Sequence, residues 1–206
     1  MNKHKRSGTC IIALKNSRGK ILIAADRRAS WDWSKSMAMN KPKVRKRGDF
    51  IIAGTGDGSL CSLFVDAFDP PEYEDQDLDI FMQHTFYKKV KQHLLNHDYG
   101  DQHRLLKIPP DSGCELVIAI QGHVYTIDIH NPAEHHHTVE PYGLIAIDEV
   151  SVPYTTGCGG EHAKGAIDAL MNEGVADTKY IAKAALEVAA KNSPGCGDGS
   201  DFVVES

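Results

Sequence analysis

The sequence contains no long uninterrupted run of apolar residues. Its basic start, Met1 to Arg6, is followed by an apolar run over residues 10–14, which Lys15 interrupts. A membrane-spanning helix needs about 20 consecutive apolar residues, and a signal peptide also needs a longer apolar region than this. We therefore expect neither a signal peptide nor a membrane span.

Paired cysteine motifs and an excess of positive charge are missing too. The five cysteines are an odd number without Cys-x-x-Cys spacing, which argues against a disulfide framework or a zinc ribbon. This cysteine usage predicts a reducing, cytoplasmic setting. The formal net charge is −5 and the isoelectric point is near 6.1. We therefore expect no nucleic acid partner and no membrane partner.

The chain has 206 residues, of which 41% are hydrophobic and 25% charged, and this suits one domain with a full core. Short apolar runs between turn residues predict strands at 10–14, 20–25, 43–46, 50–53, 116–120, 124–128, 144–147 and 202–204. Apolar residues at helical spacing predict helices at 59–68, 78–95, 162–172 and 179–191. Residues 27–40 are polar and predict a loop. Because strands and helices do not alternate, we expect an α+β protein with two antiparallel sheets packed between helix layers.

Three chemically useful side chains stand at the ends of predicted strands. Thr9 begins the first strand, Asp26 ends its hairpin partner, and Lys43 begins the next pair. If the Gly8-Thr9 bond is cut, the new α-amine of Thr9 can act as a general base for its own hydroxyl. A lysine can help this hydroxyl to lose its proton, and an aspartate can orient the lysine. The pattern favours an N-terminal nucleophile.

With these residues, the sequence resembles the proteasome β-subunit family of N-terminal-nucleophile hydrolases, including its HslV branch. The resemblance covers nearly the whole chain and rests on five segments: residues 8–15 (GTCIIALK), 23–30 (IAADRRAS), 43–45 (KVR), 52–54 (IAG) and 156–160 (TGCGG). It implies a four-layer αββα sandwich and a self-processing threonine peptidase. It also implies a propeptide at residues 1–8 and a single catalytic domain at residues 9–206. Such an enzyme acts on polypeptides inside a homo-oligomeric ring, which an unfoldase ATPase can feed.

The resemblance also implies roles for individual residues. Thr9 takes the nucleophile position, with Asp26 and Lys43 in the supporting positions. Cys158 stands where the family has an assisting serine, and a thiol is a weaker hydrogen-bond donor than a hydroxyl. Gly54 and Gly159 match the oxyanion and substrate side of the site. No cofactor is required, but by this alignment the backbone carbonyls of three residues would hold a structural monovalent cation such as Na⁺: Ala190, Ser193 and Cys196.

Several alternatives stay open at this point. An ungapped alignment on Asp26 makes Cys10 the nucleophile, and a cysteine is the intrinsically stronger one. If Gly8-Thr9 stays uncut, the chain would be a catalytically silent, proteasome-like ring scaffold or binding protein. Hydrolysis of small amides is a further possibility. Three adjacent histidines, residues 135–137, point in different directions in an extended chain, so we expect a solvated loop there rather than a metal site.

Overall fold

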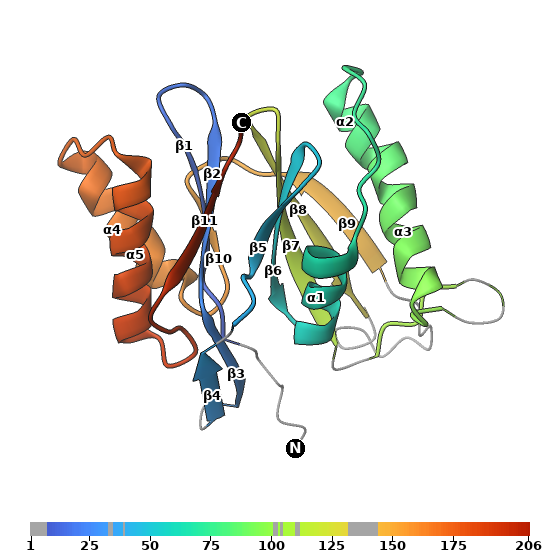
Figure 1. Cartoon of the computed structure of the whole chain (residues 1–206), viewed down its shortest axis with the longest axis horizontal. Helices are drawn as coiled ribbons and strands as arrows, with labels where there is room; N and C mark the ends of the chain where they lie inside the picture. Colours follow the sequence, from blue (N-terminus) through green and yellow to red (C-terminus); the bar gives the residue numbers. More distant parts are fainter. Residues whose placement is uncertain are drawn as a thin grey trace.

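The computed structural model shows two β-sheets stacked face to face, with helices on both outer sides (Figure 1). It describes residues 8–32, 35–38, 40–100, 103, 105–109, 112–131 and 144–206. The four-stranded sheet has the order β10-β1-β2-β11, and all its neighbouring strands are antiparallel. Its strands are β1 (Ile11–Lys15), β2 (Ile21–Asp26), β10 (Tyr154–Thr156) and β11 (Ser200–Val204). The helices α4 (Gly160–Asn172) and α5 (Thr178–Asn192) cover its outer face.

The five-stranded sheet has the order β5-β6-β7-β8-β9 and is also antiparallel. Its strands are β5 (Val44–Arg47), β6 (Phe50–Gly56), β7 (Gly113–Ile120), β8 (His123–His130) and β9 (Leu144–Glu149). Its outer face packs against α1 (Gly58–Ala67) and a long helical segment. That segment consists of α2 (Leu78–Ile80), a π-helical stretch (Phe81–Phe86) and α3 (Tyr87–Asn96). None of the described helices is long and apolar enough to cross a membrane.

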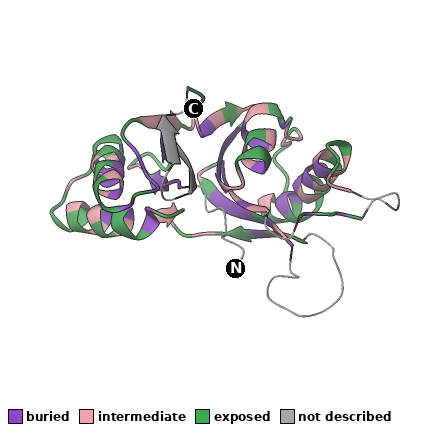
Figure 2. Ribbon diagram, turned by 90° about the horizontal axis from the view of Figure 1, so that it is seen from below, coloured by how far each residue is buried: buried purple, intermediate pink, exposed green. Residues whose placement is uncertain are grey.

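The sheets are two-sided because alternate residues of a strand point to opposite faces. In β1, Ile11 and Ala13 pack between the two sheets, whereas Ile12 and Leu14 pack against α4 and α5. All four are at most 3% exposed. Buried residues accordingly lie along both sheets, while the outer helices present exposed faces (Figure 2). The predicted four-layer αββα sandwich is confirmed.

The expected loop at residues 27–40 is wrong. The chain there forms a two-stranded hairpin, β3 (Arg28–Asp32) and β4 (Lys35–Ala38), which extends β2 beyond the four-stranded sheet (Figure 1). Residues 28–32 (RASWD) alternate between polar and apolar types, a strand signal that the loop prediction overlooked. The strand β10 was also not predicted, because it has only three residues and lies directly before a glycine-rich turn.

Candidate active site

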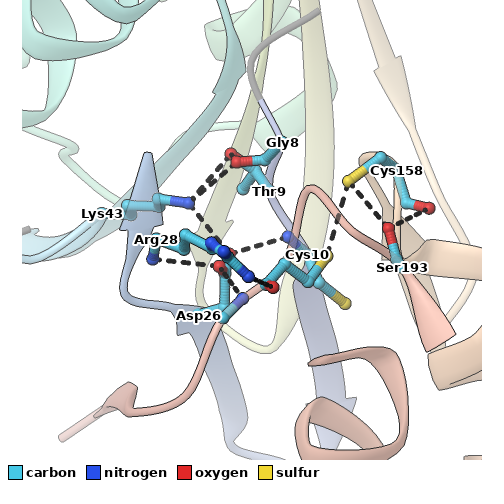
Figure 3. A network of polar contacts seen from close by, with 10 residues as sticks. Gly8, Thr9, Cys10, Asp26, Arg28, Lys43, Cys158 and Ser193 are labelled. Carbon is cyan, nitrogen blue, oxygen red and sulfur yellow. Dashed lines mark hydrogen bonds and ion pairs between the residues drawn. The ribbon is translucent and has the colours of Figure 1, made fainter. Parts of the chain in front are cut away.

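Thr9, Asp26 and Lys43 meet at one end of the space between the two sheets (Figure 3). Lys43 Nζ lies 2.9 Å from Asp26 Oδ1 and 3.0 Å from Thr9 Oγ1. Thr9 and Asp26 belong to the β1–β2 hairpin, whereas Lys43 directly precedes β5 in the other sheet. Asp26 is fully buried, and Thr9 and Lys43 are 3% and 8% exposed. The packing of the two sheets therefore brings the three predicted side chains together.

The Asp26 carboxylate is the centre of this hydrogen-bond network. Oδ1 accepts the backbone N–H of Cys10 at 2.9 Å in addition to the Lys43 ammonium. Oδ2 accepts the backbone N–H groups of Arg28 at 3.0 Å and Gly197 at 3.1 Å. Hydrogen bonds to an ionised group are stronger than neutral ones. Asp26 thus forms hydrogen bonds with the residue before β1, the start of β3 and the turn before β11. It also holds Lys43 toward Thr9.

The peptide bond before Thr9 lies within reach of the same groups. The carbonyl oxygen of Gly8 accepts the Thr9 hydroxyl at 2.8 Å and Lys43 Nζ at 3.2 Å. Gly8 packs so closely on another turn that an ideal Cβ on it would lie 2.0 Å from the carbonyl oxygen of Gly195. No side chain fits at that position. The Gly8-Thr9 bond is thereby held with its carbonyl oxygen against a positive charge.

The two candidate nucleophiles point to opposite faces of the four-stranded sheet. The Thr9 hydroxyl faces Lys43 between the sheets. Cys10 is fully buried in the apolar cluster of β1, α4 and α5, and its thiol forms a hydrogen bond with Cys196. Consecutive strand residues alternate in direction, so only one of the two can face the lysine. The geometry favours Thr9 over Cys10.

Cys158 lies beside the Thr9 backbone rather than beside its hydroxyl. Its sulfur is 3.5 Å from the Cys196 sulfur and accepts the Ser193 hydroxyl at 3.2 Å. The hydrogen bond with Cys196 and the partial burial of the sulfur raise the pKa of the Cys158 thiol well above its ordinary value, while hydrogen bonds from Ser193 and the Thr9 backbone act in the opposite direction. The thiol is therefore neutral at pH 7. It contacts the nitrogen that would become the α-amine of Thr9.

The two glycines expected on the oxyanion side have different surroundings. An ideal Cβ on Gly54 would lie 3.1 Å from Cys61 Sγ, so this side of Gly54 faces the α1 layer. Oxyanion binding by the Gly54 N–H stays a prediction. The Gly159 N–H donates to the carbonyl oxygen of Thr9 at 3.4 Å, so in the uncut chain it fixes the start of β1.

Thr55 is a neighbour of the site that the sequence analysis did not identify. An ideal Cβ on Gly157 would lie 2.2 Å from the carbonyl oxygen of Thr9 and 3.2 Å from Thr55 Oγ1. Thr55 is 7% exposed and follows Gly54 in β6. The period-2 alternation of β6 could have indicated this, because Ala53 packs between the sheets and Thr55 shares its face.

Two of the three carbonyl groups proposed for a monovalent cation already have partners. The Cys196 carbonyl accepts Arg28 Nη1 at 3.0 Å, and the Ser193 carbonyl accepts the N–H of Cys196 at 3.0 Å. A cation held by Ala190, Ser193 and Cys196 would share an oxygen with a guanidinium, and like charges repel. These three residues do not fit such a cation well, and no step below depends on one. The three histidines at residues 135–137 lie outside the described residues.

Comparison with solved structures shows the fold. BPH of Thiobacillus denitrificans, in complex with epoxomicin, matches with a TM-score of 0.66 and 22% identity over 95% of this chain and 97% of that chain. Eukaryotic HslV of Trypanosoma brucei matches with a TM-score of 0.59 and 16% identity over 95% and 98% of the two chains. Anbu (ancestral beta-subunit) of Yersinia bercovieri matches with a TM-score of 0.59 and 14% identity over 95% and 81%.

Comparisons at the level of sequence alone give no match. No protein-family model matches the chain, and neither does any curated protein. Identities of 14–22% establish a shared architecture but not a shared activity. With its two stacked sheets, its outer helices and its whole-length structural matches, the chain has the fold of the proteasome-like N-terminal-nucleophile hydrolases.

Proposed function

We propose that this chain is a self-processing threonine peptidase with Thr9 as its nucleophile. The observation that carries the proposal is the position of Lys43 Nζ, which contacts the Thr9 hydroxyl at 3.0 Å and the Gly8 carbonyl oxygen at 3.2 Å. One buried ammonium thus touches both the attacking group and the bond to be cut. Asp26, at 2.9 Å, holds this ammonium in place.

Self-cleavage can follow from this geometry. The Thr9 hydroxyl passes its proton to water, and its oxygen attacks the carbonyl carbon of Gly8. The new O–C bond closes a five-membered ring. Lys43 donates to the Gly8 oxygen as negative charge develops on it, and a donor placed there stabilises the tetrahedral intermediate. The C–N bond then breaks, and the Thr9 nitrogen takes up a proton. Water hydrolyses the resulting ester, which releases residues 1–8 and leaves Thr9 with a free amine and a free hydroxyl.

The mature residue can then cleave other peptides. The α-amine accepts the hydroxyl proton, and Oγ1 attacks a substrate carbonyl to form an acyl-enzyme that water hydrolyses. We assign the oxyanion to backbone N–H groups that include that of Gly54. The Cys158 sulfur and the Ser193 hydroxyl lie on the nitrogen side of Thr9, where they can orient the α-amine. All of these groups belong to the chain, so the proposal requires no cofactor.

We extend the proposal to the assembly and its surroundings. A peptidase with an exposed, unselective nucleophile would damage other proteins, and enclosure in a homo-oligomeric ring avoids this. Entry into such a chamber requires unfolded polypeptide, for which an unfoldase ATPase in the cytoplasm is the natural supplier. The molar mass of the purified protein in solution tests the ring.

A catalytically silent ring scaffold or binding protein is the second candidate. It is favoured by the burial of Thr9, which is 3% exposed in the uncut chain, and by the close contact of Gly8 with Gly195. Both features would suit a first strand that keeps residues 1–8 permanently.

Intact mass spectrometry separates these candidates. We expect wild-type protein to be lighter by residues 1–8, the Thr9→Ala variant to keep its full length, and the matched Cys10→Ala variant to be processed like wild type. A wild-type product that lacks nine residues would move the nucleophile to Cys10. Wild-type protein that keeps its full length under all conditions would exclude the peptidase and support the catalytically silent scaffold or binding protein. Epoxomicin, present in the Thiobacillus structure, is a second probe, and we expect it to add mass to the processed protein but not to Thr9→Ala.

A further inference from the structure

Three of the five cysteines form a contiguous sulfur cluster (Cys10, Cys158 and Cys196) next to Thr9. The sulfurs of Cys158 and Cys196 are 3.5 Å apart, and the Cys196 thiol also forms a hydrogen bond with that of Cys10. The peptidase chemistry proposed above uses Cys158 only as a neighbour of the α-amine, and it gives Cys10 and Cys196 no thiol chemistry. The proposed reaction therefore does not explain why three thiols lie together beside Thr9.

The Cys158–Cys196 pair has the geometry of a disulfide precursor. A disulfide bond is about 2.05 Å long, so the two sulfurs must approach by about 1.5 Å. Both cysteines lie in turns rather than in strands or helices: Cys158 between β10 and α4, and Cys196 between α5 and β11. Glycines flank both, and an ideal Cβ on Gly195 would lie 2.6 Å from the Cys158 sulfur. The turns approach each other closely because these side chains are missing.

The two thiols differ in their access to solvent. Cys158 is exposed, whereas Cys196 is fully buried behind it. A small oxidant can therefore reach the first thiol, and the second can resolve the product. The hydrogen bond with Cys10 raises the pKa of Cys196 to about 12, and that of Cys158 is raised further. Since thiolate is the reacting form, we expect slow oxidation at pH 7 that accelerates as the pH rises.

We propose that Cys158 and Cys196 are an oxidative modification site, at which a low-molecular-weight disulfide converts the two thiols into an intramolecular disulfide. The Cys158 thiolate attacks one sulfur of the small disulfide and expels the first small thiol, which leaves a mixed disulfide. The Cys196 thiolate then attacks the Cys158 sulfur and expels the second. The protein loses two protons and two electrons, and the small disulfide becomes two thiols.

This modification acts on the site that surrounds Thr9. The turn that carries Cys196 also provides the Gly197 N–H to Asp26 at 3.1 Å and the Cys196 carbonyl to Arg28 at 3.0 Å. The Cys158 sulfur receives the backbone hydrogen bond from Thr9. Closing the disulfide moves these groups by about 1 Å, and a displacement of that size can cost about 100-fold in rate. This second part of the inference rests on the proposed peptidase activity.

The test starts with a readout that needs no activity. Folded protein is incubated with oxidised glutathione at pH 8, free thiols are blocked with N-ethylmaleimide, and peptides are mapped by mass spectrometry. We expect a Cys158–Cys196 cross-linked peptide that dithiothreitol removes. Cys196→Ala should instead keep glutathione on Cys158, because no resolving thiol remains. Cys61→Ala is the matched control. The Cys61 thiol forms a hydrogen bond with the Cys114 thiol at the other sheet, so this variant should form the Cys158–Cys196 link normally.

Peptide hydrolysis is then measured for each protein before oxidation, after it and after reduction. Wild type and Cys61→Ala should lose activity by about 100-fold and recover it on reduction. Wild type without the cross-link, or with glutathione retained on Cys158 as in Cys196→Ala, would overturn the modification site. A cross-link that leaves the rate unchanged would overturn its effect on Thr9. A cross-link in a protein without any peptidase activity would support the modification site and count against the proposed function alone.

Discussion

The central position of the Asp26 carboxylate can be tested by comparing two substitutions that each remove one charge. Asp26→Asn keeps the size of the side chain but replaces one oxygen with an NH₂ group. Lys43→Met removes the ammonium and keeps an unbranched stem of similar length. Asp26 accepts four hydrogen bonds, three of them from backbone N–H groups, whereas Lys43 provides only one of the four. The two variants should therefore differ in stability.

The expected costs follow from what each variant leaves behind. In Asp26→Asn the new NH₂ group faces N–H donors, and Lys43, only 8% exposed, loses its counter-charge. Removing one partner of a buried pair costs about 3–5 kcal/mol in the free energy of unfolding. In Lys43→Met the carboxylate keeps its three backbone N–H donors. For this carboxylate the loss is one charged hydrogen bond, about 1.5–3 kcal/mol. The Gly8 carbonyl and the Thr9 hydroxyl also lose Lys43 as a partner, but they keep the hydrogen bond between them.

Urea unfolding followed by circular dichroism measures both values, at one protein concentration so that any assembly contributes equally. Both variants should lose cleavage at Gly8-Thr9, because each disturbs the ammonium beside the Thr9 hydroxyl. The test is the order of the stability losses. A Lys43→Met variant that is destabilised as much as Asp26→Asn, or more, would show that the ammonium rather than the carboxylate organises this region, and would refute the reasoning above.

Three further predictions concern the glycine turn, pH and cations. Gly157→Ala should lower the free energy of unfolding by at least about 2 kcal/mol and stop cleavage, because Gly157 has a φ of +84° and no room for a Cβ beside Thr9. The control Gly165→Ala has open space around it in α4 and should raise the free energy of unfolding in urea by about 0.5–1 kcal/mol. Equal effects of the two substitutions would contradict this account. Burial lowers the pKa of His93 below 6.5. The unfolded chain therefore binds more protons at this residue than the folded chain, and stability should fall as the pH drops below 6.5. If a His93→Gln variant shows the same pH profile of the melting temperature as wild type, His93 is not the cause. Because Arg28 already provides positive charge at the Cys196 carbonyl, replacing NaCl by choline chloride should leave the melting temperature unchanged, and stabilisation specific to Na⁺ or K⁺ would show that a cation binds after all.

Much of the fold could be predicted because its strands and helices carry simple patterns. Short apolar runs such as Leu116 to Ile120 and the apolar face of α5 are buried as expected. The β3–β4 hairpin was missed because only β3 alternates polar and apolar residues (RASWD), whereas β4 (KSMA) does not and forms through its pairing with β3. The strand β10 depends on its neighbour β1 rather than on its own three residues. Both failures arise where tertiary pairing, not local sequence, determines the conformation.

The choice between Thr9 and Cys10 shows what the site required beyond motif matching. Alignment alone left both residues open, because one extra residue in a hairpin turn shifts the register by one. The alternation of β1 removes that freedom: Ile11 packs between the sheets and Ile12 against the helices, so the residue two before Ile11 must face Lys43. Once the buried face of β1 is known, Thr9 follows. The thiol cluster could not be deduced in this way, because its members come from three turns or strand ends that are adjacent only in space.

The same geometry explains why the contact of the Thr9 hydroxyl, the Lys43 ammonium and the Asp26 carboxylate depends on the fold. Lys43 reaches Thr9 because β5 of one sheet packs over β2 and β11 of the other. Asp26 orients the lysine only while Gly197 and Arg28 donate to its second oxygen. Loosening the contact between the sheets would separate the ammonium from the hydroxyl without changing any site residue. Self-cleavage at Gly8-Thr9 should therefore require the fully packed sandwich. An unfolded or partly folded chain should keep residues 1–8, and the loss of these residues should follow folding in time.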